Sequence, residues 1–191
     1  TGSSGVNDSF LEHPTKHRKA KIRETEQIEA LSFFGFPLSH IRFLRLPEDQ
    51  QGDMILDAEC RKTVGKLFQE FNPDMMALPY GEDSNPSHQR TFALARQLAM
   101  AASKVVLAFY NQDPKTIKMQ LDAYIAFDQA TSLWKREMLR FHHSQQTRNL
   151  QTRGYGFDER ILKVNAVIAK QLKTNQAYAE GFQVELFEPA L

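Results

Sequence analysis

The sequence predicts an α/β domain in which helices flank a mainly parallel β-sheet. Segments with apolar residues at helical spacing alternate along the chain with short apolar runs, which is the pattern of strand-helix-strand units. The length of 191 residues suits one domain with its own core, so we treat 1–191 as a single domain. Hydrophobic residues make up 41% and charged residues 25%, a composition typical of a folded globular chain.

Residues 1–78 are predicted to hold two helices and two strands. Their order is a turn-rich loop over 1–5, a helix over 15–34, a strand over 41–46, a helix over 56–71 and a strand over 74–78. Gly35 is a suitable stop for the first helix, because glycine adopts the left-handed conformation of helix C-termini without strain. Alternating apolar and polar residues indicate the first strand. Asn72-Pro73 ends the second helix, and the apolar run after it is typical of a buried parallel strand.

Residues 79–191 continue the same alternation. Their order is a polar loop over 79–87, a helix over 88–103, a buried strand over 105–109, a short strand over 118–121, a long helix that follows 122–127 and runs to about Asn149, a helix over 158–173 and a closing strand over 182–187. The stretch Gly154-Tyr155-Gly156 separates the last two helices and is too short to be a phosphate-binding loop.

The composition argues against several classes of partner. A net charge of +1 does not suit a protein whose main work is binding nucleic acid. The basic stretch Lys16–Arg23 is interpreted as a solvated helix face, because the acids of Glu24–Glu29 balance it. Docking of that stretch on an anionic membrane surface stays open as an alternative. No apolar run of about 18 residues and no signal peptide is present, so no membrane span is expected. The single cysteine, Cys60, fits a reducing compartment, and we expect a cytoplasmic protein.

The loop over 79–87 is the first place to expect a functional site, because sites of parallel α/β sheets form beyond the carboxyl ends of the strands. Glu82, Asp83, Asn85 and His88 follow the strand over 74–78 within a few residues. Imidazole is a common zinc ligand, and a carboxylate can bind the metal or orient a ligating histidine. A catalytic zinc normally has about three protein ligands. The spacing alone therefore leaves His88 open as either a ligand or a structural residue at a helix start.

His142 and His143 form a second polar cluster, late in the predicted long helix. Adjacent residues on a helix point about 100° apart, so these two imidazoles cannot readily share one metal ion. We interpret the pair as a helix surface with one residue turned inward.

Six segments, taken in order, resemble the motifs of one enzyme family. They are Arg23-x-x-Glu26-x-x-x-Ala30 ending at Phe34-Gly35, Phe43-Leu44-Arg45-Leu46-Pro47-Glu48-Asp49, Asn72-Pro73-Asp74, Glu82-Asp83-Ser84-Asn85-Pro86-Ser87-His88-Gln89-Arg90-Thr91, Lys135 with His142-x-Ser144-Gln145, and Tyr178-Ala179-Glu180-x-Phe182. This series resembles the LmbE/PIG-L family of zinc-dependent de-N-acetylases and covers nearly the whole chain.

The resemblance implies a Rossmann-like fold and a hydrolase that cleaves a carbon–nitrogen bond other than a peptide bond. Its chemistry would be metal-assisted amide hydrolysis, in which zinc or another divalent ion activates a water and polarises the acetyl carbonyl. The substrate would be an N-acetylated amino sugar, such as an N-acetylglucosamine unit of a glycoconjugate. The partner it implies is therefore a small molecule or glycoconjugate.

By position in the resembled motif, His88 would be a metal ligand and Asn85 a catalytic residue. The family often has a histidine where Asn85 stands, and that histidine is thought to stabilise the oxyanion or to transfer a proton. An amide can donate a hydrogen bond to an oxyanion, but it cannot transfer a proton near neutral pH. Asn85 thus puts the usual acid role in doubt and leaves metal binding intact.

Four further residues match positions around the substrate. Arg23 and Asp49 match positions associated with the sugar pocket. Asp83 and His142 are expected to support the metal ligand or to lie near the pocket.

One motif of the family does not occur in 1–191. The family begins with a strand ending in His-Pro-Asp-Asp, which supplies two zinc ligands and the general base. His13-Pro14-Thr15 lacks the acids and follows the opening loop. We therefore expect a strand-helix-strand unit of about 30 or more residues before residue 1, and we expect 1–191 alone to be poorly stable and inactive. Two rivals stay open: a non-catalytic carbohydrate-binding relative, and an unrelated α/β module.

Overall fold

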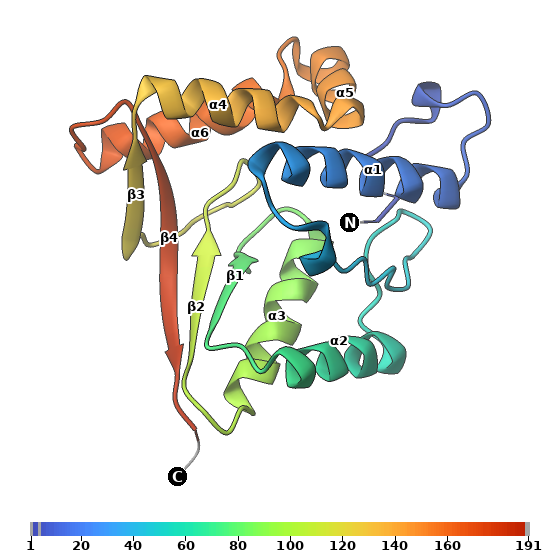
Figure 1. The fold of residues 1–191 in the computed structure, drawn as a ribbon, viewed down its shortest axis with the longest axis vertical. Helices are drawn as coiled ribbons and strands as arrows, with labels where there is room; N and C mark the ends of the chain where they lie inside the picture. Colours follow the sequence, from blue (N-terminus) through green and yellow to red (C-terminus); the bar gives the residue numbers. More distant parts are fainter. Residues whose placement is uncertain (1, 4, 190–191) are drawn as a thin grey trace.

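The computed structural model describes residues 2, 3 and 5–189 and contains one four-stranded sheet with helices around it (Figure 1). The elements are α1 (Lys16–Phe34), α2 (Ala58–Phe71), β1 (Met75–Pro79), α3 (Pro86–Met100), β2 (Val106–Asn111), β3 (Ala123–Phe127), α4 (Gln129–Arg140), α5 (His143–Arg153), α6 (Phe157–Gln171) and β4 (Tyr178–Phe187), with short 3-10 turns at Asp8–Phe10 and Leu38–His40. Within the expected opening loop, Gly2, Ser3 and Gly5 belong to no helix or strand, and Thr1 and Ser4 lie outside the described residues.

The sheet is mixed, with the strand order β1-β2-β4-β3. β1 and β2 are parallel, whereas β4 runs antiparallel to both β2 and β3. The α/β class is confirmed, but the expectation of a mainly parallel sheet is wrong for these four strands. Alternation of apolar residues marks a strand without indicating its direction. The expectation that β1 is buried is also wrong, since β1 lies at the edge of the sheet and Met75 is 63% exposed.

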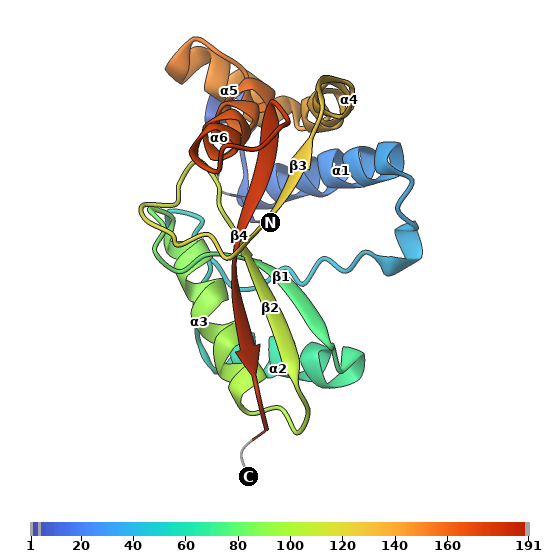
Figure 2. The same ribbon diagram turned by 90° about the vertical axis from the view of Figure 1, so that its left-hand side faces the viewer.

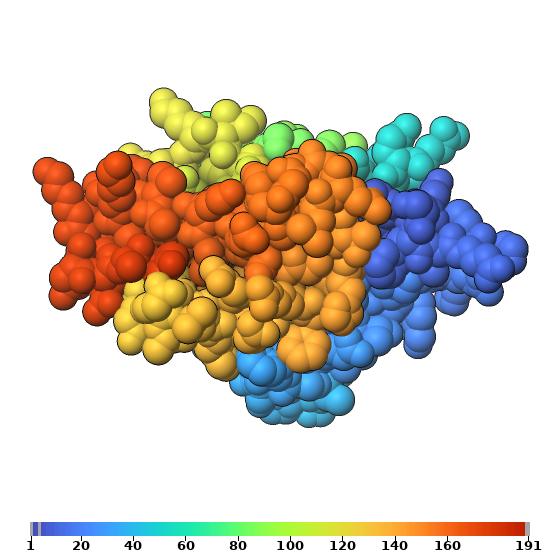
Figure 3. Space-filling model, turned by 90° about the horizontal axis from the view of Figure 1, so that it is seen from above, coloured from blue at the N-terminus to red at the C-terminus, as the bar shows by residue number. Residues whose placement is uncertain are grey.

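The helices are distributed between the two ends of the molecule. Figures 1 and 2 show α4, α5 and α6 together at one end, α2 and α3 near the other end, and α1 between the two groups. α6 packs along β4, and α3 packs against β1. The view from above shows α5 beside the N-terminal segment (Figure 3), where Asn7 Nδ2 donates to Gln151 Oε1. No helix in the described part of the chain has both the length and the apolar character that a bilayer crossing requires.

The core is built around β2. Val106, Ala108 and Tyr110 alternate along this strand and are all buried, as the period of two in a strand requires. Phe187 of β4 completes this cluster from the neighbouring strand. The Tyr110 hydroxyl donates to Glu185 Oε2 at 2.9 Å, so the one polar atom of that buried ring is satisfied. β2 is therefore firmly held, and it fixes where the loop after Asn111 begins.

The predicted strand over 41–46 is wrong, because this segment is irregular in the structure. Its backbone turns at Arg45, which has a left-handed φ of 48° and whose side chain pairs with Glu24 on α1. None of the four described strands pairs with it. The strand expected over 118–121 is also displaced, since the chain forms β3 after Asp122 instead. The Asp122 carboxylate accepts a hydrogen bond from Val184 N at 2.9 Å, beside the start of that pairing.

The long helix expected to reach about Asn149 is two helices, α4 and α5, with a break at Phe141 and His142. No proline or glycine causes the break. Ser144 N donates to Glu26 Oε1 at 2.5 Å, so a buried carboxylate of α1 takes a backbone donor at the start of α5. A tertiary contact of this kind is not visible in local sequence, and it explains why helical periodicity alone missed the break.

Candidate metal and substrate site

Two loops meet at the edge of the sheet where the parallel strands β1 and β2 end. The loop after β1 leads into α3, and the loop after β2 leads toward β3. Backbone bonds join them, with Ser84 N donating to Lys115 O at 3.0 Å and Ile117 N donating to Glu82 O at 2.8 Å. An antiparallel bridge between Asp83 and Thr116 lies between these two bonds. Side chains from the two loops are thus brought to one place and held there.

The loop after β1 is shaped by a glycine and by the cap of α3. A Cβ added at Gly81 would lie 2.5 Å from the Phe92 ring, so only glycine fits where the loop passes this helix. Asn85 is the N-cap of α3, and its Oδ1 accepts from Ser87 N at 2.9 Å. Pro86 occupies the first turn, where its missing N–H costs no helical bond. This start of α3 places His88 one turn into the helix, facing the loops.

Asp83, His88 and Asp113 form a cluster that could hold a metal ion. Their nearest ligand atoms all lie within 4.8 Å of one another. His88 Nδ1 is 2.8 Å from Asp83 Oδ2 and 3.5 Å from Asp113 Oδ2. Asp83 is fully buried, Asp113 is partly buried, and the His88 side chain is 28% exposed. One imidazole and two carboxylates are donors that suit zinc and other divalent ions, so the residues present fit such an ion.

The contact between His88 and Asp83 fixes the role of each ring nitrogen. A separation of 2.8 Å is a hydrogen-bond length, and a carboxylate accepts, so Nδ1–H donates to Asp83 Oδ2. Nε2 then carries the lone pair. Among the described residues it has no hydrogen-bond partner, and His88 lines the pocket. This is the arrangement in which a carboxylate orients a metal-binding histidine. The predicted supporting role of Asp83 is therefore compatible with its position.

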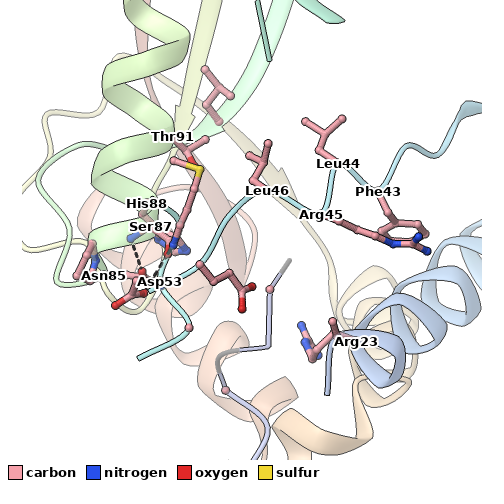
Figure 4. A pocket seen from close by; sticks show the side chains of 18 of the residues that line it. Arg23, Phe43, Leu44, Arg45, Leu46, Asp53, Asn85, Ser87, His88 and Thr91 are labelled. Atoms are coloured by element: carbon pink, nitrogen blue, oxygen red, sulfur yellow. Dashed lines mark hydrogen bonds between the residues drawn. The ribbon is translucent and has the colours of Figure 1, made fainter. Parts of the chain in front are cut away.

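Asn85 lies beside this cluster and also lines the pocket. Its backbone N–H donates to Asp83 Oδ1 at 2.6 Å, and its side-chain oxygen is used by the helix cap. The side-chain Nδ2 has no partner among the described residues, so it is the atom that can donate to a ligand. Ser87 Oγ donates to Asp53 Oδ1 at 2.9 Å, which brings a further carboxylate to this wall. Figure 4 shows Asn85, Ser87, His88 and Asp53 close together.

The site opens into a pocket of about 1630 Å³. This volume exceeds the roughly 300–1,000 Å³ of a typical small-molecule pocket. His88 and Asn85 lie at one wall, Arg23 lies across the space from them, and Phe43–Leu46 run along another side (Figure 4). The irregular segment over 41–46 thus contributes to the pocket and not to the sheet.

Arg23 lines the pocket, whereas His142 lies behind it. Arg23 Nη1 donates to Glu26 Oε2 at 2.6 Å and lies 3.5 Å from His142 Nδ1. Glu26 also accepts from Ser144 Oγ at 2.9 Å, so these four side chains form one connected polar network. Burial of the imidazole, together with the neighbouring Arg23 guanidinium, lowers the pKa of His142 to about 4. His142 is therefore neutral at pH 7, and it supports Arg23 from outside the pocket.

Asp49 occupies a turn and is not among the described residues that line the pocket. Its Oδ1 accepts from Asp53 N at 2.9 Å and from Gln51 N at 3.0 Å. The backbone N–H of Asp53 holds the pKa of the Asp49 carboxyl below its usual value. These bonds shape the turn that carries Asp53. A direct contact of Asp49 with sugar stays a prediction.

Residues of different resembled motifs form hydrogen bonds with one another. Glu26 of the first motif bonds to Ser144 of the fifth, as described above, and thereby links α1 to α5. Lys135 on α4 bonds to Glu180 on β4 and donates to Asn165 Oδ1 at 2.9 Å. Polar residues that are far apart in the sequence are therefore structural partners, and several motif residues hold helices in place without touching the pocket.

Two residues of the site were missed in the sequence. The position of Asp113 could have been predicted from the sequence. It is the first acid after β2, which is parallel to β1, and the carboxyl ends of adjacent parallel strands lie at the same edge of the sheet. Asp53 has no local signal, since an acid in a polar turn is common. Its position becomes evident only from its bond to Ser87.

The fold and this site define a class of protein: α/β domains with a site beyond the carboxyl ends of two parallel strands. Solved structures of several enzymes share the fold. N,N'-diacetylchitobiose deacetylase from Pyrococcus horikoshii, in complex with its inhibitor, is 18% identical with a TM-score of 0.67, over 96% of this chain and 69% of that chain. The zinc-inhibited form of teicoplanin deacetylase is 15% identical with a TM-score of 0.61, over 92% of this chain and 77% of that chain.

A third similar structure is that of an enzyme with a different activity, a hydratase. The 4-carboxy-2-hydroxymuconate hydratase GalB from Pseudomonas putida is 15% identical with a TM-score of 0.63, over 95% of this chain and 77% of that chain. No protein-family model matches the sequence, and no curated protein matches it. These likenesses confirm the α/β fold class. Because the same fold serves deacetylases and a hydratase, the reaction has to be argued from the site.

Proposed function

We propose that this chain belongs to a metal-dependent hydrolase of the LmbE/PIG-L type, which removes an acetyl group from an N-acetylated amino sugar. N-Acetylglucosamine-containing glycoconjugates are the proposed substrate class. The observation that carries the proposal is the position of His88. Its Nδ1 is held by the buried Asp83, it lies beside Asp113, and it lines a large pocket of a fold shared with deacetylases.

His88 is the proposed metal ligand through Nε2, and Asp83 orients it through Nδ1. Asp113 Oδ2 lies 3.5 Å from the same Nδ1, so Asp113 supports the imidazole from that side and is not assigned as a ligand of an ion at Nε2. A bound zinc or other divalent ion supplies a Lewis acid for the acetyl carbonyl and lowers the pKa of a coordinated water. The His-Pro-Asp-Asp motif of the resembled family does not occur in 1–191, so we assign the role of general base to none of the residues named above.

Asn85 is the proposed oxyanion donor. Its Oδ1 caps α3 and its Nδ2 is unengaged among the described residues, so the amide can donate a hydrogen bond where negative charge develops on the acetyl oxygen. It cannot transfer a proton to the leaving amine. Arg23 is the proposed contact for sugar hydroxyls from the opposite wall, and Asp49 acts with it or through the turn that it shapes.

A non-catalytic carbohydrate-binding protein is the second candidate. The observation that favours it is Asn85 itself, because an amide that already caps a helix needs no catalytic reason to be there. Under this hypothesis the pocket and Arg23 remain, and the water-activating groups are lost.

The test measures zinc content and acetate release from an N-acetylglucosamine glycoside. The protein is compared with two variants. His88→Ala is expected to lose both the metal and the activity, because it removes the nitrogen ligand. His143→Ala removes an exposed histidine on α5 and is the matched control. It is expected to keep both.

Three outcomes separate the candidates. One equivalent of divalent metal with acetate release, both lost in His88→Ala, supports the deacetylase. Metal binding without acetate release from any N-acetylated sugar rejects the substrate class. Binding of the sugar by a protein that takes up no metal supports the carbohydrate-binding relative.

A further inference from the structure

Four cationic side chains gather on one wall of the pocket. Lys115 comes from the loop after β2, Arg148 and Arg153 come from α5, and Arg160 comes from α6. All four line the pocket. The chain as a whole has a net charge of only +1, so this local excess of positive charge results from how the fold arranges its residues.

The cationic group adjoins the candidate metal cluster. Arg160 Nη2 donates to Pro114 O at 3.4 Å, one residue after Asp113. Lys115 N donates to Asp113 Oδ1 at 2.6 Å. Arg148 Nη1 lies 3.2 Å from the point where a Cβ of Gly5 would stand, so it approaches the backbone at the pocket wall. A ligand that reaches His88 therefore lies close to Lys115 and Arg160.

None of the ion pairs in the described part of the chain includes any of these four cations. Other arginines of the same pocket are neutralised: Arg23 pairs with Glu26, and Arg45 pairs with Glu24. Lys16, Lys21 and Arg42 also line the pocket without an ion pair, so what distinguishes this wall is its place beside Asp113.

The four charges also act on one another. Burial lowers the pKa of the Arg160 guanidinium, and the neighbouring Arg153 lowers it further. Like charges held close together repel one another, and a bound anion would relieve that repulsion.

We propose that Lys115, Arg148, Arg153 and Arg160 bind an anionic group of the substrate, a phosphate or a carboxylate, while the acetamide lies at His88. The proposal rests on the proposed function and narrows its substrate to an acylated amino sugar that carries a negative charge. The arginine guanidinium suits this task, because its donors match the paired oxygens of a phosphate or carboxylate.

The test measures binding by calorimetry, in the presence of a chelator, so that neither metal nor turnover is needed. The ligands are N-acetylglucosamine, its 6-phosphate, and N-acetylmuramic acid, which provide a neutral, a phosphate and a carboxylate form of the sugar. At least one anionic sugar is expected to bind about tenfold or more tightly than the neutral sugar. Arg148→Gln and Arg160→Gln are each expected to weaken that binding about tenfold, as loss of a charged hydrogen bond does.

Arg61→Gln is the matched control, because Arg61 lies on α2, bonds to Gln97 and is not among the described residues that line the pocket. It removes the same charge and is expected to leave binding unchanged. Preference for the phosphate sugar or for the carboxylate sugar identifies which anion the wall takes. Equal binding of all three sugars overturns the proposal, and so does an anion preference that survives in the Arg148→Gln/Arg160→Gln double variant.

Acetate release on the metal-loaded protein separates this proposal from the proposed function. If the protein prefers anionic sugars but releases no acetate, the anion-binding proposal stands and the deacetylase proposal is rejected. If the protein releases acetate from neutral sugars and shows no preference for anionic sugars in binding, the deacetylase proposal stands and the anion-binding proposal is overturned.

Discussion

At the scale of single residues, the site depends on how His88 is held. Replacing Asp83 with Asn exchanges a carboxylate for an amide, so Nδ1 loses its carboxylate partner. We expect metal affinity to fall about 10–100-fold, as for other residues that orient a ligating histidine. Zinc titration of the variant measures this. Asp74→Asn, at an exposed acid paired with Lys104, is the control; unchanged affinity in Asp83→Asn would show that Asp83 does not orient His88.

Asn85 combines two tasks that substitutions can separate. Asn85→Ala removes the cap of α3 and is expected to cost about 1 kcal/mol of the free energy of unfolding. Asn85→Ser keeps a capping oxygen but has no amide donor. It is expected to retain most of the stability and to lose about 10²–10³-fold in acetate release, if Nδ2 donates to the oxyanion. Urea unfolding and acetate assays on both variants measure the two effects, and full activity in Asn85→Ser would contradict the oxyanion role.

Most of these residues could be identified from the sequence. Those that only strand pairing or helix packing brings to the site could not be linked to it in that way. His88 and Asp83 are close in sequence and share one loop, so their association is visible in the sequence. Asp113 joins them only through the pairing of β1 with β2. Arg23 and His142 are 119 positions apart, and only the packing of α1 against α5 brings them together.

At the scale of elements, α1 and α5 are joined through one buried carboxylate. Ser144→Ala removes the hydroxyl that donates to Glu26, and it leaves a buried acid with one fewer partner. We expect a loss of about 1–3 kcal/mol in the free energy of unfolding. Ser103→Ala, at an exposed serine, is the control and is expected to change little. Chemical denaturation followed by circular dichroism measures both. A Ser144→Ala variant as stable as the control would show that this bond does not hold α5.

Element boundaries were predictable where a local signal marks them. Gly35 and Asn72 end α1 and α2 in the left-handed conformation, as their residue types suggest. The division of α4 from α5 had no such signal; the contact found there is tertiary, between Ser144 N and Glu26 on α1. The segment over 41–46 has the pattern of a strand, but a strand also needs a neighbour to pair with, and the four described strands provide none.

At the scale of the whole molecule, His142 makes stability depend on pH. The folded protein holds this imidazole at a pKa of about 4, against an ordinary value of 6.5. The unfolded chain therefore binds more protons between these two values, and stability falls as the pH is lowered through them. Between pH 7 and pH 5 we expect a loss of about 2 kcal/mol from this group. His142→Gln cannot titrate, so the difference in pH dependence between the wild type and this variant isolates the contribution; parallel curves would contradict it.

The position of β4 has a consequence for synthesis on the ribosome. β4 lies between β2 and β3, yet both of these strands are translated before it. Until Tyr178–Phe187 emerges, β2 and β3 each present an open edge whose backbone groups can pair with another chain. A ribosome that stalls within α6 would therefore release a nascent chain with nearly all its helices and no completed sheet. Chaperones that shield strand edges are the factors such a chain would need until β4 pairs with β2 and β3.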